Sequence, residues 1–145
     1  MATLAPSQQG ARSGVVGIML VDDHAIVRQG LRSILEREDD LRVVAEASSA
    51  SEALAVVGRA NPQIVLLDLK LSTSSDSEGL ELCQQLTAQH PDVGVLVLTT
   101  FLDEQLVLQA IRAGARGYVV KDVDTTELLR SIRAVGLRLR PLPFV

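Results

Sequence analysis

Residues 15–23 read Val-Val-Gly-Ile-Met-Leu-Val-Asp-Asp, an unbroken apolar run that ends in two carboxylates. A run of this length without polar alternation predicts a strand that is buried on both faces. Similar runs occur at residues 63–68, Gln-Ile-Val-Leu-Leu-Asp, and at residues 93–98, Val-Gly-Val-Leu-Val-Leu. Strands of this kind are typical of a parallel sheet covered by helices on both sides. These three stretches therefore predict the interior of an α/β domain.

Segments with helical spacing of apolar residues separate the strands. Two shorter strands are expected at residues 41–45 and 117–120, and Ser51 is expected to cap the second helix. Asn61-Pro62 is expected to end that helix, and Gly136 to end the last one. The inward-facing residues of the five helices are expected to be Val27, Leu31, Ile34 and Leu35; Leu54 and Val57; Leu80, Cys83 and Leu86; Leu106, Val107, Ala110 and Ile111; and Leu128, Leu129, Ile132 and Val135.

Five strand–helix units in succession predict the fold class. We expect an α/β domain, a (βα)5 doubly wound five-stranded parallel sheet with the flavodoxin-like strand order 2-1-3-4-5. One domain is expected over residues 15–136, in keeping with a chain of 145 residues. Residues 1–14 are expected to form a flexible tail, and residues 137–145 a tail or the start of a linker, with no output domain present.

Composition narrows the class of protein. Apolar residues make up 47% of the chain and aromatic residues only 2%, so aliphatic side chains must fill the core. The formal net charge of −4 gives no overall electrostatic attraction to nucleic acid. The single cysteine, Cys83, excludes an internal disulfide and suits a reducing compartment. The apolar run Val15–Val21 is far shorter than the roughly 20 residues that span a bilayer, so a cytoplasmic protein without a membrane partner is expected.

Polar side chains follow the apolar runs where the strands end. Asp22 and Asp23 follow the first strand, Asp68 ends the third, Thr99 follows the fourth and Lys121 follows the fifth. Ligands of open α/β sheets bind at the carboxyl ends of the strands. We therefore expect three carboxylates, a hydroxyl and an ammonium to converge at one edge of the sheet.

Carboxylates gathered in one pocket repel each other. A pair about 4 Å apart costs about 4 kcal/mol at an effective dielectric constant near 20, so a bound cation is expected. Oxygen ligands select a hard ion, and a small site of this type suits Mg²⁺. The neighbouring His24 is instead expected to cap or pack at the start of the first helix.

Mg²⁺ beside a lysine and a threonine suits phosphoryl transfer, because metal and ammonium neutralise the phosphoryl oxygens. Asp68 stands alone at the end of the central strand, so it is the candidate nucleophile that would form an aspartyl phosphate. Each of these residues taken singly is more often a helix cap or a turn former. The functional interpretation therefore depends on their convergence.

The strand ends resemble a known family. Leu20-Val-Asp-Asp-His24, Val65-Leu-Leu-Asp-Leu69, Val97-Leu-Thr-Thr-Phe101 and Gly117-Tyr-Val-Val-Lys-Asp122 are similar, in order and spacing, to the receiver domain of two-component response regulators. Residues 23–31 and 110–118 resemble the NarL/FixJ subfamily in particular. The resemblance covers about residues 15–136.

The resemblance implies a role for each acidic position. Asp68 would accept a phosphoryl group from a histidine kinase or from a small donor such as acetyl phosphate. Asp23, Asp68 and the backbone carbonyl of Lys70 would bind Mg²⁺ directly, and Asp22 would act through a metal-bound water.

It also implies a switch. Lys121 would pair with the phosphoryl oxygens, Thr99 would hydrogen-bond the group after transfer, and Tyr118 would follow by changing rotamer. Such a protein is not an enzyme beyond its own phosphorylation and dephosphorylation. It would control an output, usually transcription, and would reach DNA only through a helix-turn-helix domain missing from this chain. A phosphorylation-dependent homodimer is a further hypothesis.

The loop after Asp68 departs from the family pattern. It reads Leu-Lys-Leu-Ser-Thr-Ser-Ser-Asp-Ser-Glu-Gly over residues 69–79, which is longer than usual and lacks proline. Its serine-rich part, residues 72–77, predicts a flexible lip that would affect the lifetime of the phosphoryl group.

Three other functions are weighed against this interpretation. Haloacid-dehalogenase-like phosphatases place two aspartates two residues apart after the first strand, whereas Asp22 and Asp23 are adjacent and the Asp-x-Asp at 122–124 follows the fifth strand. A pseudo-receiver with an inert pocket finds support only in the altered loop. A flavin site would need phosphate-binding donors where this chain has two carboxylates.

Overall fold

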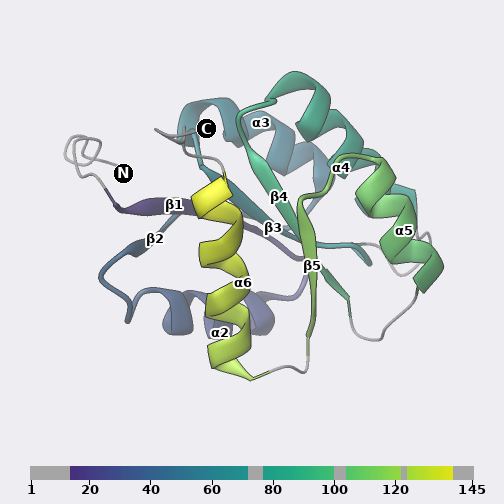
Figure 1. Ribbon diagram of the computed structural model, residues 1–145. Helices are drawn as coiled ribbons and strands as arrows, with labels where there is room; N and C mark the ends of the chain where they lie inside the picture. Colours follow the sequence, from purple (N-terminus) through teal and green to yellow (C-terminus); the bar gives the residue numbers. More distant parts are fainter. Residues whose placement is uncertain (1–13, 72–76, 100–103, 122–123, 139–145) are drawn as a thin grey trace, which may run out of the picture.

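The computed structural model describes residues 14–71, 77–99, 104–121 and 124–138, in which five strands alternate with five helices (Figure 1). The elements are β1 (Val16–Val21), α2 (Ala25–Leu35), β2 (Leu41–Ala47), α3 (Ala50–Ala60), β3 (Ile64–Asp68), α4 (Ser77–Gln89), β4 (Gly94–Thr99), α5 (Glu104–Arg112), β5 (Gly117–Val120) and α6 (Thr125–Arg138). All strand pairs are parallel and the order is β2-β1-β3-β4-β5, which confirms the predicted fold class. No helix in these ranges has the length and apolar character needed to cross a membrane.

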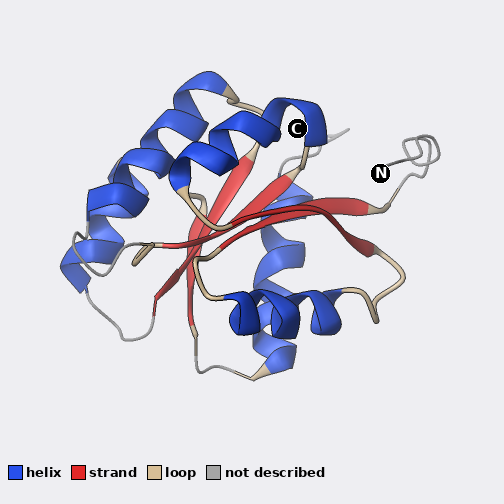
Figure 2. Ribbon diagram, turned by 180° about the vertical axis from the view of Figure 1, so that it is seen from behind, coloured by secondary structure: helices blue, strands red, loops and turns tan. Residues whose placement is uncertain are grey.

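The helices form two layers around the sheet. Helices α3, α4 and α5 cover one face, and α2 and α6 cover the other (Figure 2). Because side chains of a strand alternate between faces, β1 contributes Met19 and Val21 to the first layer and Ile18 and Leu20 to the second. The central strand β3 is buried along its whole length. This double burial is the reason for its continuous apolar sequence.

In the edge strand β2, the face of the sheet to which the odd-numbered side chains point changes midway along the strand. Ile18 of β1 lies opposite Val43, but the next residue, Met19, lies opposite Ala45, so β2 contains one extra residue at Val44. This β-bulge reverses the alternation beyond it. Leu41 lies in the cluster under α2 and α6, whereas Ala47 lies in the cluster under α3, α4 and α5. Glu46 consequently occupies a position on the α2 side of the sheet.

The start of α3 differs from the prediction. Its N-cap is Ser49 rather than Ser51, and the Ser49 hydroxyl accepts a hydrogen bond from the amide of Glu52 at 3.1 Å. The Glu52 carboxylate in turn accepts from the amide of Ser48 at 2.6 Å. Ser49 is followed three residues later by a glutamate, the spacing that a reciprocal cap requires, whereas Ser51 is not. The predicted end is confirmed, since Asn61 adopts the left-handed conformation that closes the helix.

Two predictions about the C-terminal helices were wrong. Helix α6 does not end at Gly136 but continues to Arg138. A Cβ atom at Gly136 would lie 3.5 Å from Val16 and 3.6 Å from Ile64, which is ordinary van der Waals contact, so this glycine lies in the part of the helix that packs on the sheet. Ile111, predicted to face inward, is 41% exposed, because α5 buries Leu106, Val107 and Ala110 instead.

The strand register brings the predicted site residues to one edge. Val21 of β1 lies opposite Leu67 of β3, so the next residues, Asp22 and Asp68, reach the same level. Thr99 of β4 lies opposite Val120 of β5, which brings Lys121 to this edge as well.

Candidate functional site

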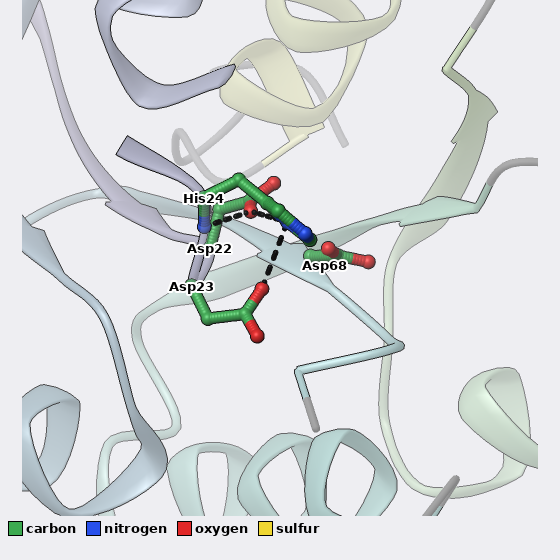
Figure 3. Close-up of side chains that lie close together, drawn as sticks. All are labelled: Asp22, Asp23, His24 and Asp68. Carbon is green, nitrogen blue, oxygen red and sulfur yellow. Dashed lines mark hydrogen bonds and ion pairs between the residues drawn. The ribbon is translucent and has the colours of Figure 1, made fainter. Parts of the chain in front are cut away.

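Three aspartates from two neighbouring strands meet at this edge (Figure 3). Asp22 and Asp68 are each 1% exposed, whereas the side chain of Asp23 is 30% exposed. One oxygen from each aspartate and one ring nitrogen of His24 all lie within 4.8 Å of one another. The structure therefore brings together the acidic residues that the sequence placed at the ends of β1 and β3.

Lys121 is the cation closest to the buried pair. Its Nζ donates to Oδ2 of Asp68 at 2.8 Å and lies 3.5 Å from Oδ2 of Asp22. Its backbone amide donates to the carbonyl of Thr99 at 2.6 Å, which fixes the residue just beyond the end of β5. Lys121 thus contacts both buried carboxylates, Asp68 and Asp22.

The protonation equilibria reflect this crowding. Burial raises the pKa of the Asp68 carboxyl, and the hydrogen bonds from Lys121 and from the Lys70 amide offset this effect only in part. Burial opposes protonation of Lys121, but its contacts with Asp68 and Asp22 outweigh that effect and raise the pKa of its ammonium. Ionised Asp68 therefore costs folding free energy, while Lys121 stays charged at neutral pH.

A pH dependence follows from the raised pKa of Asp68. In metal-free buffer, the raised pKa of Asp68 adds its full contribution to the free energy of unfolding at pH values below the unfolded pKa of about 4. This contribution is lost as the pH rises through the pKa of the folded state. We expect Asp68→Asn to become progressively more stable than the unmodified chain above about pH 4, with a slope below about 1.4 kcal/mol per pH unit. Urea unfolding of both proteins over a pH series measures the difference. A difference that shrinks as the pH rises would contradict the shift.

One oxygen of the cluster lacks a hydrogen bond. Oδ1 of Asp22 accepts from the backbone amide of His24 at 2.9 Å, but the buried Oδ2 has no hydrogen-bond partner among the described residues. This buried oxygen has only the Lys121 ammonium nearby, at 3.5 Å, and it lies beside two further carboxylates, so it fits a bound cation better than it fits an apolar interior. The candidate metal ligands are carboxylate oxygens, apart from the His24 ring nitrogen, and oxygen ligands suit Mg²⁺.

His24 lies at the start of α2 as predicted, with its ring against the acidic pair. It occupies the N-cap position, yet its side chain makes no capping hydrogen bond. Its Nδ1 lies 3.1 Å from Oδ1 of Asp22 and 2.9 Å from Oδ1 of Asp23, and 58% of the side chain is exposed. The two carboxylates attract the ring away from the helix terminus and onto the acidic pair (Figure 3).

The remaining predicted residues flank the cluster. The backbone amide of Lys70 donates to Oδ1 of Asp68 at 3.0 Å, whereas coordination of a metal by its carbonyl stays a prediction. Thr99 is buried at the end of β4, and Tyr118 on β5 is 44% exposed. The predicted flexible lip at residues 72–77 falls outside the described residues except for Ser77.

Sequence reasoning missed three residues behind the site, Arg28, Arg32 and Glu46. Arg28 of α2 donates from Nη1 to the backbone carbonyl of Asp22, and its Nε lies 3.2 Å from Oε1 of Glu46. Arg32, one turn later on α2, pairs with the other oxygen of Glu46. Glu46 lay beyond the predicted end of the second strand, and its contact with Arg28 requires the register shift at Val44.

Comparison with known proteins agrees with this architecture. A family model described as the response regulator receiver domain matches residues 18–133. Over 122 residues the chain is 44% identical to the DNA-binding transcriptional activator DevR/DosR of Mycobacterium tuberculosis, covering 84% of this chain and 55% of that protein. It is 34% identical over 122 residues to the transcriptional regulatory protein LiaR of Bacillus subtilis, covering 84% and 56%. The chain thus spans little more than half the length of these relatives.

Solved structures give the same result. A two-component response regulator of the LuxR family from Aurantimonas sp. SI85-9A1 has a TM-score of 0.79 and 37% sequence identity, covering 88% of this chain and 89% of that chain. The response regulator domain of Thermotoga maritima CheB, at 23% identity and a TM-score of 0.76, shares the fold. The family model, the relatives and the fold agree, and the chain belongs to the response regulator receiver domain family.

Proposed function

We propose that this receiver domain accepts a phosphoryl group on Asp68 from a histidine kinase, or from a small donor such as acetyl phosphate, in a Mg²⁺-dependent reaction. The observation that carries the proposal is the 2.8 Å contact of Lys121 with Asp68 at the centre of a buried acidic cluster. A structural ion pair alone would not need two further carboxylates, since each adds repulsion.

The proposed transfer is a nucleophilic displacement. A carboxylate oxygen of Asp68 attacks the phosphorus of the donor, and the bond from phosphorus to the leaving imidazole nitrogen or acetate oxygen breaks. An acyl phosphate forms on Asp68, and the leaving group departs with the electron pair. Attack of water on phosphorus later releases inorganic phosphate and restores the carboxylate.

Residues already in contact with Asp68 would stabilise the transferred group. The Lys70 amide holds one carboxyl oxygen at 3.0 Å and Lys121 holds the other, so new phosphoryl oxygens on this carboxyl fall within reach of the ammonium. The buried hydroxyl residue Thr99 would hydrogen-bond the phosphoryl group after transfer, and Tyr118 would respond by changing rotamer.

The metal would be held by the acidic residues of the cluster. Asp23, Asp68 and the backbone carbonyl of Lys70 would bind Mg²⁺ directly, and Asp22 would act through a metal-bound water. Bound Mg²⁺ neutralises negative charge on the carboxylates and on the incoming phosphoryl group. Its binding would therefore remove the repulsion that the buried carboxylates otherwise retain.

The wider role follows from the family. The protein would act in the cytoplasm as a switch rather than as an enzyme with an external substrate, catalysing only its own phosphorylation and dephosphorylation. Its output would be control of transcription, since the relatives are named as transcriptional regulators. DNA would be bound only through a separate output domain. A phosphorylation-dependent homodimer is part of the same proposal.

Acetyl phosphate labelling tests the proposed function. Intact-mass spectrometry of the chain is expected to show the gain of one phosphoryl group with acetyl phosphate and Mg²⁺, and no gain when Mg²⁺ is replaced by a chelator. Absence of labelling with Mg²⁺ would contradict the proposal and favour an inert pseudo-receiver. Continued hydrolysis of small phosphoesters over many turnovers would instead favour a phosphatase.

A further inference from the structure

The backbone of Asp22 is held on both sides of its Cα atom. The amide of Asp22 donates to the carbonyl of Ala47 on β2 at 3.1 Å. The carbonyl of Asp22 accepts a hydrogen bond of 2.5 Å from Nη1 of Arg28 on α2. The Asp22 carbonyl, but not the Asp22 amide, belongs to the peptide group that links Asp22 to Asp23, so its contact with Arg28 helps to set where both carboxylates lie at the edge of the sheet.

Arg28 is itself fixed by an acidic partner. Its Nε lies 3.2 Å from Oε1 of Glu46, and the two side chains are only 19% and 24% exposed. A partly buried, charge-assisted contact of this kind restricts a flexible guanidinium to one geometry. The β-bulge at Val44 makes the pair possible, since it turns Glu46 toward α2.

We propose that Arg28 is a positioning residue for the metal site. Held by Glu46, it fixes the Asp22–Asp23 turn in the geometry that binds Mg²⁺, without touching the metal or the phosphoryl group. This inference rests on the proposed function, and it assigns Mg²⁺ affinity in part to residues outside the acidic cluster. Partners that orient metal ligands from behind typically contribute 10–100-fold to affinity.

The direction of the change in Mg²⁺ affinity distinguishes a positioning role of Arg28 from a purely electrostatic one. Arg28 is a cation next to an acidic site, so through electrostatics alone its removal would tighten the binding of a divalent cation. Through positioning, its removal weakens binding. Arg32 provides the matched control, because it lies one turn away on the same helix and pairs with the same Glu46, and among the described residues it does not contact the Asp22 carbonyl.

Mg²⁺ titration of Arg28→Met, Arg32→Met and Glu46→Gln in the full chain tests the proposal, with circular dichroism and urea unfolding to verify that each variant folds. We expect Arg28→Met to bind Mg²⁺ at least about tenfold more weakly, Glu46→Gln to show a smaller loss, and Arg32→Met to bind as tightly as the unmodified chain or more tightly. At saturating Mg²⁺, acetyl phosphate should label Arg28→Met at nearly the unmodified rate, because Arg28 does not contact the reacting atoms.

Three results would overturn the inference, and each is distinguishable from the others. If the unmodified chain binds Mg²⁺ while Arg28→Met binds it equally well or more tightly, Arg28 acts only as a charge or as a structural residue. If the unmodified chain binds no Mg²⁺ at all, the proposed function fails and this inference fails with it. Should Arg28→Met not fold, Glu46→Gln keeps both arginines on α2 and tests the same dependence, and an unchanged affinity would overturn the inference.

Discussion

Replacing Asp68 by asparagine is expected to abolish Mg²⁺-dependent labelling by acetyl phosphate. Asparagine has nearly the same shape and its carbonyl oxygen can still accept from the Lys70 amide, so the pocket is kept. Its amide is not a nucleophile of the carboxylate kind, and it gives up the charge that binds the metal. Intact-mass spectrometry should therefore show no more phosphoryl gain in this variant than in a reaction without donor.

The control for Asp68→Asn is Asp92→Asn. Asp92 is exposed and precedes β4 at the opposite end of the sheet, so this variant should label as fully as the unmodified chain. Urea unfolding of Asp68→Asn distinguishes loss of the acceptor from loss of the fold, and the raised pKa of Asp68 predicts that the variant stays folded at neutral pH. Equal labelling of Asp68→Asn and the unmodified chain would show that another residue is the acceptor.

Replacing Gly79 by alanine is expected to destabilise the protein by about 3 kcal/mol, since overpacking of a filled interior costs roughly this much. A Cβ atom at Gly79, in the first turn of α4, would lie 2.3 Å from the backbone oxygen of Leu69 and 2.8 Å from its Cα. Backbone atoms cannot rotate away as a flexible side chain can. Relief would require movement of the segment that directly follows Asp68, so phosphorylation should slow as well.

Gly30→Ala is the matched control for this effect. Gly30 lies within α2, and a Cβ atom there would meet nothing within 4 Å. Alanine favours a helix over glycine by up to about 1 kcal/mol, so this variant should be slightly more stable than the unmodified chain. Urea unfolding of the two variants measures the contrast. Equal stabilities would show that the contact of Gly79 with Leu69 does not constrain the fold.

Features that depend on one element and its period could be predicted from sequence. The apolar run that ends at Val21 and the one that ends at Leu67 identified buried parallel strands, and the residues after them identified the acidic cluster. The fold follows from the same regularity, because successive strand–helix units leave few topologies open. For this reason the strand order and the meeting of Asp22 with Asp68 were expected.

Features that depend on contacts between elements could not be predicted. Gly136 has the local pattern of a helix end, but it packs against Val16 and Ile64 of the sheet and α6 continues past it. Ser51 was a plausible cap until the contacts of Glu52 with the Ser49 hydroxyl and the Ser48 amide were visible. The pairing of Arg28 with Glu46 depends on how β2 is aligned with β1, which no local pattern of the chain records.

Because of the extra residue at Val44, the start of β2 packs into the cluster under α2 and α6, and its end packs into the cluster under α3, α4 and α5. The number of residues between Leu41 and Glu46 is therefore fixed by packing against both helix layers, whereas the length of a surface loop can vary. Loss of one residue here would send a carboxylate toward the aliphatic layer under α3 and turn two alanines the other way. Through Glu46 and Arg28, the β-bulge in β2 thus makes the position of Asp22 at the end of β1 depend on a fixed number of residues in the neighbouring strand.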